Sequence, residues 1–258
     1  GYRNQRVVQT KTRPTKAVTI GTRKAPAPDN RPGFIRIDSV HQGDLDGVKG
    51  LYHINAVDCV TQWQVTASVQ TISEAHLLPV IEQMLAQFPF RILGFHADNG
   101  SEYVNHRVAG MLDKLRIEFT RSRPRRSNDN GLAETKNGAV IRKVFGYAHI
   151  EQRHAARFNT FCMEYLNPFL NFHRPCLFAT DVADPKKPGR IKKVYRPKDA
   201  MTPLDKLASL PDAHQFLKDG VTLEELQMLA CALTDVQAAQ ELNDARSALF
   251  KRVSARTC

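Results

Sequence analysis

The sequence lacks the paired cysteines and histidines that build zinc sites. Its five cysteines stand apart with no CxxC pair, and its nine histidines form neither HxxxH nor HExxH. Such spacings supply the usual ligands of structural and catalytic zinc. The pattern therefore argues against a zinc site or a disulfide framework, and it favours reduced thiols in a cytoplasmic compartment.

Long apolar runs and targeting signals are missing as well. No run approaches the roughly 20 residues needed to cross a bilayer. The N-terminus does not combine the basic, apolar and cleavable regions of a signal peptide. The first residue is glycine rather than methionine, so we expect a processed or cloned fragment. Whether a sequence-reading DNA-binding module precedes Gly1 stays open.

Acidic residues are scarcer than basic ones. The 258 residues include 37 Lys and Arg against 26 Asp and Glu, which gives a net charge of +11. An apolar content of 42% indicates a globular chain, long enough for one core with an appendage or for two domains. The positive excess suggests a polyanionic partner, most simply nucleic acid.

The hydrophobic pattern predicts a mixed α/β fold. Alternating or short apolar runs predict five strands, at 34–40, 51–60, 62–70, 91–100 and 116–120. Apolar residues at helical spacing predict helices at 74–88, 103–114, 132–150 and 155–172. Three consecutive strands imply an antiparallel meander, to which the later strands and helices add a layered α/β core.

Segments of different composition flank this core, which we assign to residues 33–178. Residues 1–32 carry a single acid, Asp29, among many basic residues, and we expect a basic arm or linker. Residues 179–203 are again basic and rich in turn formers, which predicts a second linker. Residues 204–258 have periodic apolar positions and should form a helical C-terminal region.

Three carboxylates in this core could meet. Asp38 lies in the first strand, Asp98 ends the fourth, and Glu134 lies near the start of a helix after a glycine-containing loop. Carboxylates on adjacent central strands repel each other unless a cation lies between them. Three carboxylates make a hard oxygen ligand set that suits magnesium or manganese. Asp58 is a rival in the second strand.

The segments around these acids, "RIDSV", "HADNGSEY" and "NDNGLAETKN", resemble the three acidic motifs of the DDE integrase and transposase superfamily. The 35 residues between Asp98 and Glu134 match the spacing of its D,D-35-E group. The resemblance covers about residues 33–175 and is greatest to bacterial insertion-sequence transposases. It implies an RNase H-like five-stranded sheet, flanked by helices, with Asp38, Asp98 and Glu134 as catalytic metal ligands.

The resemblance further implies what the site does. Two Mg²⁺ or Mn²⁺ ions would assist cleavage of a DNA strand at a mobile-element end and its transfer to target DNA. The protein would act as a homo-oligomer on double-stranded DNA, near the bacterial nucleoid. Two alternatives stay open: an RNase H-like nuclease that does not join strands, and a domesticated DNA-binding protein without catalysis.

Basic residues around the site are candidates for DNA contact, because they could neutralise backbone phosphates. One group precedes or follows Glu134: Arg121, Arg123, Arg125, Arg126, Lys136, Asn137, Arg142 and Lys143. The second group lies in the linker, where an aromatic ring could stack on bases: Lys192, Lys193, Tyr195 and Arg196. His96 shares a strand face with Asp98, and a hydrogen-bonded core histidine is the simpler interpretation.

Overall fold

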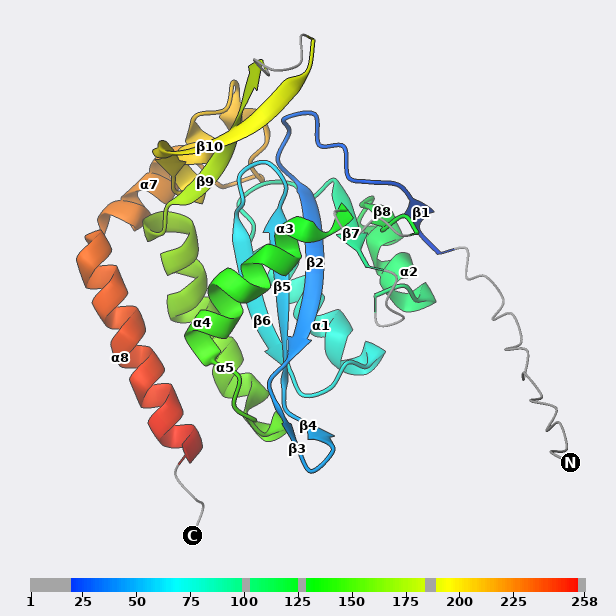
Figure 1. Ribbon diagram of the computed structural model, residues 1–258, viewed down its shortest axis with the longest axis vertical. Coiled ribbons are helices and arrows are strands. Elements are labelled where there is room, and N and C mark those ends of the chain that lie inside the picture. Colours follow the sequence, from blue (N-terminus) through cyan, green and yellow to red (C-terminus); the bar gives the residue numbers. More distant parts are fainter. Residues whose placement is uncertain (1–19, 99–102, 125–128, 184–188, 255–258) are drawn as a thin grey trace, which may run out of the picture.

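The computed structural model describes residues 20–98, 103–124, 129–183 and 189–254, and it contains the predicted mixed sheet (Figure 1). The five expected strands are β2 (Phe34–His41), β5 (Tyr52–Asp58), β6 (Gln64–Val69), β7 (Gly94–Ala97) and β8 (Glu118–Arg121). Strand β5 pairs antiparallel with β2 and β6, whereas β7 pairs parallel with β2 and β8. This sheet confirms the RNase H-like fold.

A sixth strand extends the sheet beyond the prediction. Strand β1 (Thr22–Arg23) pairs parallel with β8, and Lys24 forms an ion pair of 2.5 Å with Glu118. The strand order is therefore β1-β8-β7-β2-β5-β6. Thr22 and Arg23 therefore join the sheet, which differs from the separate basic arm that the composition of residues 1–32 predicts. Residues 1–19 of that arm lie outside the described residues.

One face of the sheet packs against α1 (Glu74–Ala86) and α2 (His106–Lys114), which lie behind it in Figure 1. Ile35 and Ile37 of β2 point into this layer and share a core cluster with Leu77 and Ile81 of α1. Because side chains alternate along a strand, Arg36 and Asp38 face the opposite layer.

The opposite layer is built from two irregular helices. The first joins α3 (Gly131–Lys136), the π-helical η2 (Asn137–Ile141) and α4 (Arg142–Phe145), and it ends at Gly146, where φ is +73°. The second follows a 3-10 turn, η3 (Gln152–His154), and joins α5 (Ala155–Phe161), η4 (Cys162–Leu166) and η5 (Phe169–His173). A second apolar cluster lies between them.

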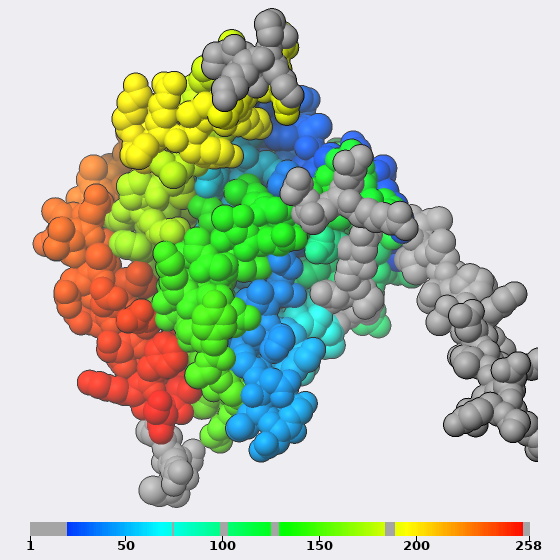
Figure 2. Space-filling view, viewed as in Figure 1, coloured from blue at the N-terminus to red at the C-terminus, as the bar shows by residue number. Residues whose placement is uncertain are grey.

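Two hairpins leave the sheet. The small one pairs β3 (Asp44–Leu45) with β4 (Val48–Lys49). The larger pairs β9 (Cys176–Ala183) with β10 (Ile191–Met201), and it projects at the upper edge of the molecule in Figures 1 and 2. The composition of this segment predicts a basic linker over most of its length. β-Branched residues that pair across the two strands, such as Thr180 and Val194, explain the difference.

The C-terminal helices complete the core rather than forming a separate region. They are α6 (Pro203–Ala208), α7 (Leu223–Cys231) and α8 (Asp235–Ser254), with a 3-10 turn, η6 (Ala213–Gln215), after α6. Leu204, Leu207 and Leu226 are buried in the same cluster as α1. None of the helices in the described ranges is long and apolar enough to cross a membrane.

Candidate active site

Asp38 and Asp98 lie side by side on the polar face of the sheet. The parallel pairing of β2 with β7 matches Arg36 to His96 and Ile37 to Ala97. One residue further, the same register brings Asp98, which directly follows β7, next to Asp38. Neighbouring strands are about 4.8 Å apart. Asp38 therefore lies on a central strand, and Asp98 directly follows the parallel strand beside it.

Polar residues continue this row on both sides. Asn55 of β5 pairs directly with Asp38 across the antiparallel ladder. On the other side, Ser122 follows β8, and its backbone N–H donates to the carbonyl oxygen of Ala97 across 3.1 Å. The Ser122 hydroxyl donates to Oδ1 of Asp98 across 2.9 Å. Each aspartate is thus flanked by an uncharged polar residue.

Glu134 reaches the same face from α3, which packs across β2 and β5 (Figure 1). Buried side-chain amides hold the helix there. Asn130 donates to the carbonyl oxygen of Ile37 across 3.0 Å, and Asn55 donates to that of Ala133 across 3.1 Å. Glu134 itself is exposed in the first turn. The helix start is therefore fixed beside Asp38, with the Glu134 side chain open to solvent.

The other two carboxylates act electrostatically on Asp38. Burial is the main cause that raises the pKa of Asp38 to about 6, and the negative charges of Asp98 and Glu134 raise it further. Hydrogen bonds from the backbone of Ser39 and the side chain of Asn137 lower this pKa. Asp98 and Glu134 thus both lie within electrostatic reach of Asp38, although the three acids come from separate parts of the chain.

The donor chemistry of this group fits a hard divalent cation, because all its ligand atoms are carboxylate oxygens. In the described parts of the chain, however, no three His, Cys, Asp or Glu side chains are gathered closely enough to hold a metal ion. Asp38 and Asp98 accept hydrogen bonds from neighbouring protein groups instead. Binding one ion would therefore require these side chains to turn towards a shared point.

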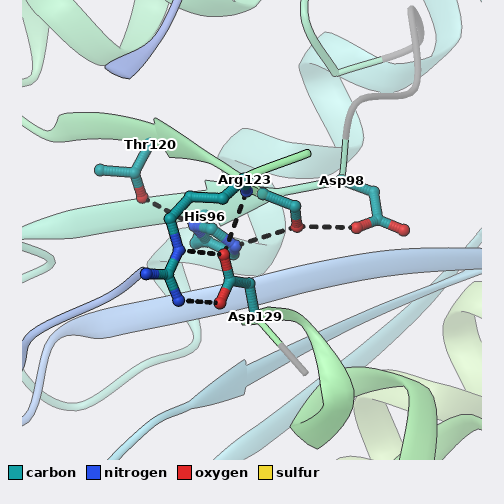
Figure 3. Close-up of polar contacts among 6 residues, drawn as sticks. His96, Asp98, Thr120, Arg123 and Asp129 are labelled. Carbon is teal, nitrogen blue, oxygen red and sulfur yellow. Dashed lines mark hydrogen bonds and ion pairs between the residues drawn. The ribbon is translucent and has the colours of Figure 1, made fainter. Parts of the chain in front are cut away.

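His96 lies beneath Asp98 in a hydrogen-bonded chain (Figure 3). Its Nδ1 is 2.9 Å from the hydroxyl of Thr120, and its Nε2 is 3.3 Å from that of Ser122. Burial, together with the nearby charge of Arg36, lowers the pKa of His96 to about 4, although Asp129 and Asp98 oppose this shift. His96 is therefore a neutral, buried residue with partners on both ring nitrogens.

Arg123 and Asp129 close the loop between β8 and α3 (Figure 3). Arg123 donates to Asp129 from its backbone at 3.0 Å, from Nε at 2.9 Å and from Nη2 at 2.8 Å. These bonds hold the pKa of Asp129 well below its usual range. Arg123, predicted to contact DNA, is thus engaged with an internal carboxylate. The loop residues Arg125 and Arg126 lie outside the described residues.

Two other candidates for DNA contact differ from expectation because their side chains are buried. Lys136 places Nζ 3.0 Å from Sγ of Cys176 at the base of β9. Asn137 donates from Nδ2 to Oδ2 of Asp38 across 2.7 Å and accepts from Asn55 across 3.1 Å. Both side chains turn into the protein, so they support the site rather than the surface around it.

The remaining candidates are at least partly accessible. Arg121 is half-buried, and Arg142 donates to the carbonyl oxygen of His41 across 3.1 Å while lying over the Tyr147 ring. The other side chains are exposed, namely Lys143, Lys192, Lys193, Tyr195 and Arg196. The last four belong to the β9–β10 hairpin. Among these candidates, the exposed positive charge is therefore split between the helix after Glu134 and this hairpin.

Asp58, the rival carboxylate, has a structural role. It is fully buried and accepts bonds from the backbone of Gly33 at 2.7 Å and from Val60 at 3.0 Å. Thr61 donates to it from its backbone and its hydroxyl. Burial raises the pKa of Asp58 despite these bonds. The carboxylate fixes the β5–β6 turn and does not join the acidic group.

Sequence reasoning missed the amides that hold the site, above all Asn55 and Asn130. Only the alternation of β5 could have indicated Asn55, because that residue pairs with Asp38 once the register is known. Ser122 and Asn130 lie at loop ends, where serine and asparagine are ordinary turn residues. Their roles depend on which strands become neighbours.

Comparisons with known proteins agree with the acidic motifs. Residues 31–127 match the model of the integrase core domain family, a span that includes Asp38 and Asp98 and ends before Glu134. An uncharacterized protein, y4rM of Sinorhizobium fredii, is 32% identical over 123 residues, which are 47% of this chain and 35% of that protein. This chain therefore spans about a third of the length of that relative.

Part of this chain is also similar to two solved structures. The catalytic core domain of BIV integrase is 16% identical, with a TM-score of 0.41, over 55% of this chain and 85% of that one. A chain of the simian T-cell lymphotropic virus intasome, solved in complex with a PP2A regulatory subunit, is 18% identical, with a TM-score of 0.37, over 53% and 48%. Residues 31–127 of this chain are therefore similar to the integrase core domain family.

Proposed function

We propose that this chain is the catalytic part of a transposase or integrase that cleaves DNA strands and transfers them at mobile-element ends. One observation carries the proposal: Asp38, Asp98 and Glu134 come from three elements, and the charges of the last two both raise the pKa of the first. The geometry agrees: Asp38 lies on β2, Asp98 directly follows the paired strand β7, and α3, which carries Glu134, packs across β2. The integrase core match supports the same reaction class.

In this proposal Asp38, Asp98 and Glu134 hold Mg²⁺ or Mn²⁺, with two ions per active site. Bound divalent ions supply charge stabilisation for the attacking and leaving oxygens of a phosphoryl displacement. The protein positions the three acids: the sheet register aligns the two aspartates, and buried amides hold α3, which carries Glu134, against the sheet. Because Glu134 is exposed, it is the acid best able to adjust when ions and DNA arrive.

Double-stranded DNA, as element ends and as target, is the proposed substrate. Lys143 on α4 and Lys192, Lys193 and Arg196 on the hairpin would pair with backbone phosphates, because their side chains are exposed. Tyr195, exposed among these lysines, could stack on an unpaired base. We also propose a homo-oligomer, because the two ends of a mobile element must be joined to the target in one event.

A strand-transfer assay tests the function. The chain would be incubated with Mg²⁺, DNA that carries the flanks of its own gene, and a supercoiled target. We expect cleavage and joined products, loss of both with Asp98→Asn, and no loss with Asp113→Asn, an exposed carboxylate on α2. Cleavage without joining would favour the nuclease, and DNA binding without cleavage would favour the inactive binding protein.

A further inference from the structure

We propose that Ser122, supported by His96, is a positioning residue that fixes the rotation of the Asp98 carboxylate before a cation binds. This inference rests on the proposed function, because it concerns a carboxylate of the proposed metal site. The evidence is a continuous set of hydrogen bonds that begins at Thr120 and ends on Asp98 (Figure 3).

Ser122 is a rigid partner for a carboxylate at a strand end. Its side chain is buried, with 5% exposure, and its backbone N–H extends the ladder to Ala97 across 3.1 Å. Its hydroxyl oxygen lies 2.9 Å from Oδ1 of Asp98. Asp98 follows the last residue of β7 and has left the paired part of the strand. A hydrogen bond from the neighbouring strand therefore limits its χ angles.

In the series of hydrogen bonds from Thr120 to Asp98, each donor points towards Asp98. An ionised carboxylate only accepts, so the single proton of the Ser122 hydroxyl goes to Asp98. The Ser122 oxygen can then accept from Nε2–H of a neutral His96, which leaves Nδ1 to accept from Thr120. We assign this tautomer from the network. His96 thereby keeps the Ser122 proton directed at the carboxylate.

The sheet contains a matched pair that lacks the carboxylate. His53 of β5 and Ser68 of β6 are both buried, and Nδ1 of His53 is 2.9 Å from the Ser68 hydroxyl. Among the hydrogen bonds of the described residues, none joins the Ser68 hydroxyl to an acid. Removing the Ser68 hydroxyl thus measures how far the loss of any buried histidine–serine hydrogen bond changes Mn²⁺ affinity.

Manganese binding tests the proposal without an activity measurement. Free Mn²⁺ is titrated by electron paramagnetic resonance against the wild type and S122A, S122T, S68A and D98N, with thermal unfolding as the check on folding. Loss of a group that orients a metal ligand typically weakens affinity by about 10- to 100-fold. We expect that loss in S122A, rescue in S122T, which keeps the hydroxyl, and wild-type affinity in S68A.

The outcomes separate this inference from the proposed function. If D98N loses Mn²⁺ while S122A binds like the wild type, the metal site stands and the positioning role is overturned. If S122A and S68A weaken binding equally, the effect is general and the role is again overturned. If D98N binds like the wild type, the proposed site and this inference both fail. Should S122A not fold, S122C replaces it, because a thiol is a poor donor of similar size.

Discussion

Asn137 donates a hydrogen bond of 2.7 Å to Oδ2 of Asp38, which ties the helix that carries Glu134 to the strand that carries the first aspartate. Asn137 begins the π-helical segment η2, three residues after Glu134. Such π-helical turns occur frequently at functional sites because they shift which side chains face inward. Here the inward-facing amide joins Asp38 to the helix that carries Glu134.

Asn137→Ala should weaken Mn²⁺ binding by about tenfold, because Asp38 loses a group that orients it. Titration calorimetry with MnCl₂ measures the change. Thr135→Ala, on the exposed side of the same helix, is the control and should bind normally. Equal affinities in the wild type and Asn137→Ala would show that this contact does not prepare the site.

Helical asparagines close the free edge of the sheet at β6. Asn167 accepts from the backbone N–H of Thr66 at 2.8 Å and donates to its carbonyl oxygen at 3.1 Å. Asn171 likewise accepts from the backbone N–H of Gln64 and donates to its carbonyl oxygen, each across 2.8 Å. Asn159 accepts from the backbone N–H of Ser68 across 2.7 Å. An edge strand otherwise offers these groups to another chain.

Asn167→Ala should therefore lower the free energy of unfolding by about 2–4 kcal/mol, because it leaves a buried donor and a buried acceptor unpaired. Urea denaturation measures the loss, and light scattering should detect increased association through β6. Met163, one helical turn earlier and 55% exposed, supplies the control. A loss no larger in Asn167→Ala than in Met163→Ala would contradict the edge-closing role.

His53 should make stability depend on pH. It is fully buried, its ring stacks on Phe145 with centroids 4.3 Å apart, and burial followed by the charge of Arg142 lowers its pKa to about 3. The unfolded chain binds a proton near the ordinary pKa of 6.5, whereas the folded chain does not. Stability conferred by neutral His53 is thus complete above pH 6.5 and falls as the pH drops towards 3.

The expected slope is about 1.4 kcal/mol per pH unit below the ordinary histidine pKa, or about 2 kcal/mol at pH 5. Unfolding by urea at several pH values measures it. His53→Phe keeps an aromatic ring beside Phe145 but removes the titrating group. Its free energy of unfolding should therefore change less with pH below 6.5 than that of the wild type, whatever its stability at neutral pH. Parallel curves for the two proteins would refute the assignment.

The β9–β10 hairpin should contribute to DNA affinity. Replacing Lys192 and Lys193 with alanine should weaken binding to any duplex and reduce the slope of log affinity against log salt by about 1 per lost phosphate contact. Fluorescence anisotropy in EDTA measures this without catalysis. Lys251→Ala with Arg252→Ala removes equal charge from the far end of α8, which lies away from the hairpin in Figure 2. Equal losses in both double variants would argue against a dedicated DNA-contacting hairpin.

The main fold could be predicted because its strands and helices have clear periodicity. Alternation in residues 34–40 identified β2 and also assigned Asp38 to the face opposite Ile35 and Ile37. β1 escaped prediction because a two-residue strand has no period, and it exists only because β8 offers a free edge. The β9–β10 hairpin was not predicted, because its exposed lysines, on both faces, give the segment the composition of a linker.

The sequence names the acids of the candidate site, whose role stays a prediction, but it does not indicate their supporting residues. Order, spacing and flanking residues single out Asp38, Asp98 and Glu134. The burial of Lys136 and Asn137 follows from how α3 sits on the sheet, which depends on Asn55 and Asn130 far apart in the chain. Basic or amide side chains near an acid therefore cannot be sorted into DNA contacts and internal bonds without the tertiary structure.

Anomalous diffraction from a crystal soaked in MnCl₂ tests the central claim most directly. We predict a manganese peak bounded by the carboxylates of Asp38, Asp98 and Glu134, at ligand distances of about 2.0–2.2 Å, because Mn²⁺ should replace Mg²⁺ on these oxygen ligands. The same soak of Asp98→Asn should lose the peak. Manganese bound elsewhere, with Asp38 still accepting from Ser39 and Asn137 and Asp98 still accepting from Ser122, would contradict the account.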